Sequence, residues 1–185
     1  MKISKNPFSA LFPCTIVMVS SVDTKGKPNI ITLAWVGTVC STPPMVGIAI
    51  NPLRYSYQLI DESKQFVVNI PTKNNLKEID FCGVTSGRDT DKFSITGLTP
   101  EAAEKVRPPL IRECPVNLEC IVKEKLMLGS HHLFIGEVVS VHVEKDILNE
   151  NDRIDPTKIS PIVYIQREYW SLNQKIGIHG FSKQE

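Results

Sequence analysis

The stretch NIITLAWVGTVCSTPPMVGIAINPLRYSYQLI, residues 29–60, indicates how the whole chain folds. It begins with residues 29–35, which are rich in β-branched and aromatic side chains and therefore predict a strand. Residues 36–42 are small or carry hydroxyl groups, and they predict a polar loop. Pro43 and Pro44 end this run, because neither proline can donate a hydrogen bond to a sheet.

The second half of the stretch predicts another strand and then a helix. Residues 45–50 are apolar, and the turn signal Asn51-Pro52 precedes a helix expected over residues 57–63. Arg54 and Ser56 lie just before this helix. A guanidinium group matches phosphate oxygens and a helix N-terminus adds free N–H groups, so the pattern favours a ligand with a flat polar head and an anionic tail. The plainer interpretation is that Ser56 caps the helix and Arg54 is an ordinary surface cation.

Alternation of apolar and polar residues predicts two long antiparallel strands further along the chain. The even positions are apolar in residues 116–124 and the odd positions are apolar in residues 133–143, so the opposite face of each strand is expected to be solvated. Shorter strands are expected over residues 14–22, 65–70 and 162–165. Strands outnumber helices, which favours a closed or nearly closed antiparallel barrel, because closure removes exposed strand edges.

The remaining segments predict loops, a short helix and a terminal arm. Residues 81–93 are polar and contain glycine, so they predict a surface loop. Thr99 is expected to start a helix of about two turns that Pro108-Pro109 ends. We expect residues 1–185 to form a single domain, with residues 172–185 as a C-terminal arm.

Composition excludes several classes of protein. The formal net charge is +1, with 21 basic and 20 acidic side chains, which argues against a nucleic-acid-binding surface. No apolar run has the length of a membrane helix, so no membrane association is predicted. The five cysteines are an odd set without a CxxC pair, which favours a reducing, cytoplasmic setting. His131 and His132 are adjacent and would point to opposite faces of a strand, so no metal site is predicted.

Four motifs occur together in this chain: residues 29–60, Asp91-Lys92-Phe93, residues 129–138 (GSHHLFIGEV) and residues 161–164 (PIVY). In this order they resemble the flavin reductase-like, FMN-binding split-barrel family, and within it the flavoredoxin-like branch. The resemblance implies a mainly β fold with short helices, an antiparallel split β-barrel. It also implies a homodimer that binds FMN near the subunit interface.

The resemblance and the local chemistry together nominate a set of residues for binding the flavin. These residues are Trp35, Val36, Gly37, Thr38, Cys40, Ser41, Arg54, Ser56, Tyr57, Lys92 and His132. Ser86 and Arg88, in the predicted 81–93 loop, are nominated for a substrate or nucleotide.

Each nominated residue also has a structural interpretation. Trp35 could simply fill the barrel, because large aromatic side chains are usually structural. For Cys40 we favour a structural role, since buried cysteine mostly acts as a small hydrophobe. Lys92 could form an ion pair with Asp91 on the surface, and His132 could be a solvated strand residue. These alternatives stay open at the level of sequence.

The sequence contains neither a GxGxxG nor a GxxxxGK[ST] motif, so no dedicated nucleotide domain is predicted. A nicotinamide nucleotide would then have to lie against the flavin, as the resemblance implies. The favoured function is an NAD(P)H-dependent, FMN-binding oxidoreductase in which the flavin carries the chemistry and no side chain is catalytic. The alternative is a flavoredoxin-like electron carrier that receives electrons from a redox protein. A non-enzymatic β-barrel binding module and a cysteine-nucleophile enzyme are more distant alternatives.

Overall fold

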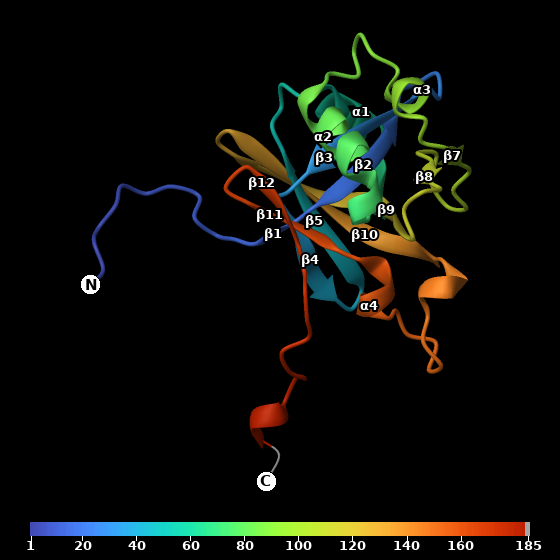
Figure 1. Cartoon of the computed structure of the whole chain (residues 1–185). Helices are drawn as coiled ribbons and strands as arrows, with labels where there is room; N and C mark the ends of the chain where they lie inside the picture. The colour runs from blue at the N-terminus through green and yellow to red at the C-terminus, as the bar shows by residue number, and fades with distance from the viewer. Residues whose placement is uncertain (184–185) are drawn as a thin grey trace.

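The computed structural model describes residues 1–183, and strands dominate it (Figure 1). The strands are β1 (Cys14–Thr15), β2 (Val17–Val22), β3 (Pro28–Leu33), β4 (Val36–Ser41), β5 (Pro44–Ile50), β6 (Gln65–Ile70), β7 (Pro100–Glu101), β8 (Leu110–Ile111), β9 (Val116–Leu128), β10 (His131–Val143), β11 (Ile162–Ile165) and β12 (Glu168–Ser171). The helices are α1 (Tyr55–Ser63), α2 (Leu76–Val84), α3 (Lys92–Thr96) and α4 (Pro156–Ile159), with 3₁₀ turns η1 (Lys73–Asn75), η2 (Lys145–Ile147) and η3 (Phe181–Lys183).

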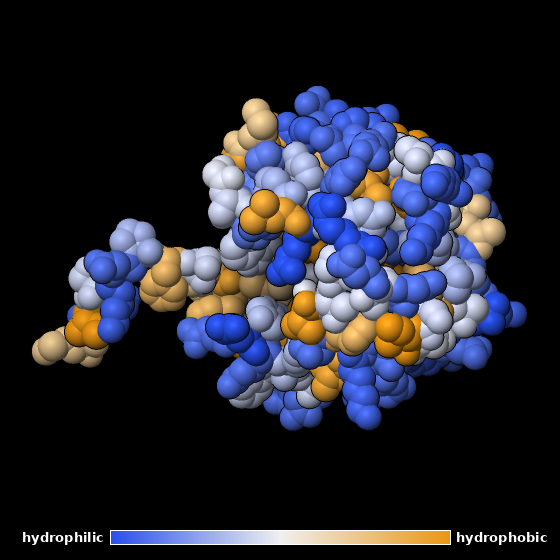
Figure 2. All heavy atoms as spheres, turned by 90° about the horizontal axis from the view of Figure 1, so that it is seen from above, coloured by the Kyte–Doolittle hydropathy of each residue, from blue (hydrophilic) through white to orange (hydrophobic). Residues whose placement is uncertain are grey.

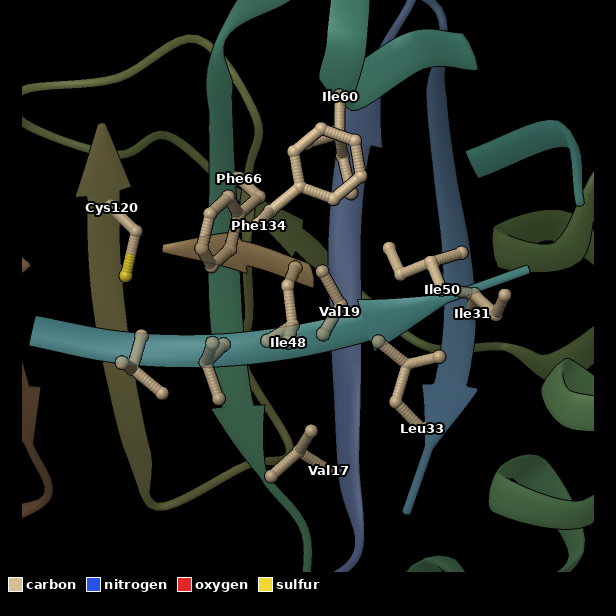
Figure 3. Packing of buried hydrophobic residues seen from close by; sticks show 12 residues of the cluster. Val17, Val19, Ile31, Leu33, Ile48, Ile50, Ile60, Phe66, Cys120 and Phe134 are labelled. Carbon is tan, nitrogen blue, oxygen red and sulfur yellow. The ribbon is translucent and has the colours of Figure 1, made fainter. Parts of the chain in front are cut away.

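Seven strands form one antiparallel sheet in the order β3-β2-β6-β9-β10-β5-β4. Side chains from β2, β3, β5, β6, β9 and β10 enter one buried cluster, so the sheet curls around a common interior (Figure 3). The backbone N–H of Ala49 in β5 donates to the carbonyl of Trp35, which follows β3, at 2.9 Å. This bond extends the β4–β5 pairing by one residue pair beyond Val36 and Ile48. The antiparallel split barrel predicted from the sequence is confirmed.

The centre of the barrel is filled by two aromatic rings, Phe66 from β6 and Phe134 from β10, both fully buried (Figure 3). Gly136 lies in β10 beside them. A β-carbon at this position would lie 2.5 Å from Cζ of Phe66 and 3.1 Å from Cβ of Cys120. Real side chains do not approach so closely, and protein interiors are close-packed. Glycine is therefore required here by the aromatic ring that occupies the adjacent space.

Replacing Gly136 with alanine should destabilise the fold by about 1–3 kcal/mol, because the added methyl group overpacks a full core. Urea unfolding followed by circular dichroism measures this change. Gly37→Ala in β4 is the matched control, since no atom lies within 4 Å of the β-carbon that it would add. Equal unfolding free energies for the two variants would show that the barrel interior has room at Gly136.

Helices α2 and α3 cover the outer face of β2 and β3. Met18 and Ile30 point outward from these strands and pack against Ile79 and Cys82 of α2 and Phe93 of α3. Both faces of β2 and β3 are thus buried. This explains why apolar residues occur at both odd and even positions of the two strands, although Ser20, Ser21, Asn29 and Thr32 interrupt them.

The polar loop predicted over residues 36–42 is wrong, because residues 36–41 form strand β4. Val36, Thr38 and Val39 are β-branched and favour an extended backbone. Thr38 pairs with Val46 of β5, so the neighbouring strand satisfies the backbone groups that a loop would leave to water. The expected stop holds, since the strand ends before Pro43.

The helix predicted after Thr99 is also wrong. Pro100–Glu101 instead form β7, which pairs with β8. The backbone N–H groups that would continue a helix, those of Glu104, Lys105 and Val106, donate to the carboxylate of Glu119. Glu119 was expected on the solvated face of its strand, yet it is fully buried beneath this segment. Burial raises the pKa of Glu119, but these N–H groups and His142 outweigh that effect and hold it below the ordinary value.

The structure reverses the face of β10 that was expected to be buried. The even residues Phe134 and Gly136 face the interior, whereas the odd residues Leu133 and Ile135 are half-buried on the outside and Val141 is exposed. Both faces of this strand carry apolar residues, so alternation alone does not say which face is inside. The contact of Gly136 with Phe66 decides it.

Two terminal segments leave the body of the molecule in different directions (Figure 1). Residues 1–12 extend from β1, which pairs with β11 in a three-stranded sheet completed by β12. Residues 172–183 are exposed and carry only the short turn η3. The last two residues of the predicted C-terminal arm lie outside the described part. Within residues 1–183, no helix has the length and apolar character needed to cross a membrane.

Candidate functional site

Two adjoining hollows lie between β3, β5 and the loops around α1 and α2. The larger hollow has a volume of about 390 Å³, and the smaller about 100 Å³. Both are lined by Ile31, Arg54 and Gly83, so they form one continuous site with Arg54 between its two parts.

The smaller hollow is lined by hydroxyl groups and cations. Arg54 is the N-cap residue of α1, and Ser56 follows in the first turn. Ser56 is buried and its Oγ accepts a hydrogen bond from Asn29 Nδ2 at 2.7 Å, so Ser56 does not act as the predicted helix cap. Ser86 lines the opposite wall. The Oδ1 atom of Asn29 is buried without a hydrogen-bond partner in the described residues.

Lys92 also lines the smaller hollow, and only 4% of its surface is exposed. Its Nζ donates to the carbonyls of Ile30 at 2.7 Å and Cys82 at 2.8 Å. Burial, with the charge of Arg54 as a smaller cause, lowers the pKa of Lys92 to about 8.

The surface loop predicted over residues 81–93 is therefore only partly correct. Helix α2 continues to Val84 and α3 begins at Lys92, so the loop itself is short. Asp91 does not form an ion pair with Lys92 but caps α3, accepting a hydrogen bond from the N–H of Ser94 at 3.1 Å. A long-range packing contact with β3 and α2 buries Lys92, and this contact leaves no local pattern in the sequence.

The larger hollow is wider and has an aromatic wall. The rings of Trp35 and His131 lie 4.4 Å apart between centroids, at 52° to each other. Thr32, Asn51 and Tyr164 complete the lining. Burial, and secondarily the charge of Arg54, lowers the pKa of His131 below its ordinary value. The imidazole of His131 is therefore neutral at neutral pH and can donate or accept a hydrogen bond.

His132, which was nominated from the sequence, points to the other face of β10. Its Nδ1 lies 2.8 Å from the hydroxyl of Tyr57, and the two rings meet edge to face. Tyr57 also packs against the barrel core, and neither of these residues lines the two hollows. Alternation along a strand signals that one of the two histidines faces the site, but the buried face of β10 is needed to say which.

The nominated residues of β4 lie away from the two hollows. Val36 lines a third hollow next to Trp35, and Gly37, Thr38, Cys40 and Ser41 follow it toward the far end of the hairpin. Ser41 pairs with Pro44, whereas the larger hollow is lined from the opposite end of β5, by Ala49 and Ile50. Cys40 is half-buried, and its thiol donates weakly to the carbonyl of Thr42 at 3.5 Å.

Arg88 lies at the rim of the smaller hollow. Its Cζ is 5.3 Å from the ring centroid of Tyr55, which lines that hollow. The structure thus brings together Trp35, Arg54, Ser56, Ser86 and Lys92 of the nominated set. It adds residues that sequence reasoning missed, which are Thr32, Asn51, Gly83, Gly87, His131 and Tyr164.

Residues 9–173 match the family described as flavin reductase like domain. The chain belongs to the flavin reductase-like family. As a member of this family it is a flavin-binding oxidoreductase.

Solved structures of the flavin reductase-like family agree with the fold. The flavoredoxin of Desulfovibrio vulgaris (Miyazaki F) superposes with a TM-score of 0.93 at 29% identity, covering 100% of both chains. The flavoredoxin of Methanosarcina acetivorans gives a TM-score of 0.91 at 29% identity, covering 100% of this chain and 98% of the other. An uncharacterized protein of Archaeoglobus fulgidus is 39% identical over 137 residues, which is 74% of this chain and 76% of that relative.

Proposed function

We propose that this protein binds FMN in the two joined hollows and passes electrons through it. The observation that carries the proposal is the division of the site into a small, cationic part and a large, aromatic part that share Arg54. Arg54 and Lys92 would hold the phosphate, with the hydroxyl of Ser56 beside them. Trp35 and His131 would flank the ring.

The bound flavin would supply acceptance and release of two electrons, and the protein supplies positioning. The purified protein tests this directly. We expect flavin absorption bands in the visible spectrum and, after heat release, FMN as the chromophore. A protein that stays colourless after saturation with FMN would contradict the proposal.

The electron donor distinguishes two versions of this function. We favour reduction by NADH or NADPH, because the larger hollow is open at Trp35, 46% of which is exposed, and a nicotinamide ring could stack there. His131, held neutral beside this opening, is the residue placed to contact the nicotinamide. The likeness to the two flavoredoxins favours the other version, an electron carrier that receives electrons from a protein partner.

Anaerobic stopped-flow mixing with NADH and NADPH should bleach the flavin band rapidly. His131→Ala should slow this reduction by about tenfold or more through lost orientation of the nicotinamide. His132→Ala is the matched control, because its side chain lies on the other face of β10, and it should reduce at the wild-type rate. If neither nucleotide bleaches the flavin while dithionite does, the carrier version is correct.

We also propose a homodimer that forms through the outer face of β4, β5 and β10. This face is unusually apolar for a barrel exterior: a β-carbon on Gly47 would contact Val39 and Leu133, and Ile135 follows on the same side. Val39 is 52% exposed although it lies at the centre of a strand. Contiguous exposed apolar patches mark interaction sites.

The cysteines are all free thiols, which supports our placement of the protein in the cytoplasm.

Val39→Lys should weaken the dimer by about tenfold or more, because it would bury an unpaired charge in the interface. Light scattering across a dilution series measures the molar mass. Val84→Lys introduces the same charge at an exposed position of α2 and should leave the dimer intact. A monomer that holds FMN tightly in the wild type would contradict the dimer proposal without affecting the flavin proposal.

A further inference from the structure

A third hollow, with a volume of about 420 Å³, lies on the other side of Trp35 from the flavin site. Its walls are the N-terminal segment around Leu11 and Pro13, strand β1, and Ala34, Trp35 and Val36. Ala34 and Trp35 also line the larger hollow of the flavin site. Whatever occupies this third hollow therefore contacts the same indole ring that we place beside the flavin.

The C-terminal arm has the properties of a segment that binds elsewhere. Residues 172–183 leave the body after β12, and their apolar side chains are exposed to solvent (Figure 1). Ile176, Ile178 and Phe181 are all exposed, with 64% of the Phe181 surface accessible. A fully extended segment of twelve residues spans roughly 40 Å, so the arm is long enough to reach a second molecule. Exposed apolar residues repeated along a free arm are costly unless a partner covers them.

The surroundings of the third hollow bear on which segment fills it. Viewed from above, the body is largely hydrophilic with separate apolar patches, and the N-terminal segment stands out from it (Figure 2). The N-terminal segment forms one wall of the third hollow, and within it the thiol of Cys14 donates weakly to the carbonyl of Leu11 at 3.2 Å. Residues 1–8 also carry exposed apolar side chains, Ile3 and Phe8 among them, but they run directly into this wall. The C-terminal arm leaves the body separately, after β12, and we take it as the segment that fills the space.

We propose that the C-terminal arm of one copy occupies the third hollow of a second copy, with Phe181 as its anchor. In a twofold dimer the exchange is reciprocal, because each copy contributes one arm and one hollow. The arm would bury the edge of Trp35 that faces the third hollow and leave the side that faces the larger hollow open, so it would support this wall of the flavin site from behind. A buried aromatic anchor with apolar neighbours is the usual centre of a stable interface.

A photo-crosslinking amino acid at position 181 tests this contact. Illumination should produce a covalent dimer on a denaturing gel, and peptide mapping should locate the crosslink in residues 11–15 or 34–36 of the other copy. The same amino acid at position 84, which is exposed on α2, is the control and should give no crosslinked dimer. Crosslinks within one chain, or to the outer face of β4, β5 and β10 alone, would overturn the proposal.

Truncation after Ser171 provides a second measurement on the intact barrel. It should raise the dimer dissociation constant by about tenfold or more and, in a Trp170→Phe background, shift the emission of Trp35 to longer wavelength as the indole becomes exposed. Unchanged dimerisation and unchanged emission would overturn the arm exchange. The flavin proposal would be unaffected by that result, since FMN binding by the wild type is measured separately.

Discussion

Replacing Arg54 with alanine should weaken FMN binding by about a hundredfold and leave the binding of riboflavin almost unchanged. Arg54 lines both hollows and is the cation between them, so its guanidinium would pair with the phosphate of FMN. Arg54 is exposed in the structure, so its contact with the phosphate would be partly solvated. Losing a charge-assisted hydrogen bond costs about 1.5–3 kcal/mol, and each 1.4 kcal/mol is a factor of ten in affinity. Riboflavin has the same ring but no phosphate, so it lacks this contact.

Flavin fluorescence titration with both ligands measures the effect. Arg88→Ala is the matched control, because Arg88 packs on the ring of Tyr55 at the rim rather than lining the smaller hollow, and its loss should change FMN affinity by less than about fivefold. Equal weakening of FMN and riboflavin by Arg54→Ala would place the phosphate elsewhere and assign Arg54 to the ring.

The affinity for FMN should also fall as the pH rises above about 8. In the free protein, burial lowers the pKa of Lys92 to about 8, so the amine is charged below this pH and neutral above it. A bound phosphate would stabilise the ammonium form and raise this pKa. Binding above about pH 8 must then take up a proton, and the affinity falls by up to about tenfold per pH unit. Below about pH 8, Lys92 is charged in both states and contributes no pH dependence.

Riboflavin titrations over the same pH range isolate the contribution of the phosphate, which is already a dianion above about pH 7. The thiol of Cys82, which lies close to Lys92, does not titrate in this window, because burial raises its pKa to about 11. Calorimetry at about pH 8.5 in two buffers of different ionisation enthalpy should detect the uptake of a proton with FMN and none with riboflavin. Identical pH profiles for the two ligands would remove Lys92 from the phosphate site.

The strands that have clear local signals at both ends could be predicted from the sequence. Residues 65–70 and 162–165 are strands β6 and β11 with the predicted bounds, because each is a short apolar run bounded by turn or proline signals. The barrel could also be predicted, from the alternation of apolar and polar residues along the strands and from the four ordered motifs that resemble those of the flavin reductase-like family. Arg54 and Ser56 could be placed together because they are two residues apart at the start of one helix.

The rest of the site depends on contacts between distant parts of the chain. Lys92 is a charged residue in a polar stretch, and only the carbonyls of Ile30 and Cys82 make its burial tolerable. Glu119 is similar, since its partners are N–H groups about fifteen residues earlier. The sequence around each of these charged residues suggests exposure to solvent. The groups that hydrogen-bond to them after burial come from distant parts of the chain, so no local pattern reveals them.

The sequence nominated His132, and the structure instead places His131 in the larger hollow, for a related reason. Side chains alternate along a strand, so the two histidines must point to opposite faces of β10. Which face is buried depends on Phe134 and Gly136, which pack against Phe66. Both faces of β10 are apolar, and we attribute the outer apolar face to the proposed dimer. The apolar residues on the outer face therefore conceal from the sequence which face of β10 belongs to the core.

The structure of crystals of this protein grown with FMN tests the central claim most directly. We predict the phosphate in the smaller hollow, within hydrogen-bonding distance of Arg54 and Lys92, and the ring in the larger hollow beside Trp35 and His131. A flavin whose phosphate lies away from Arg54 and Lys92, or whose ring lies along β4 at Thr38 to Ser41, would contradict the account.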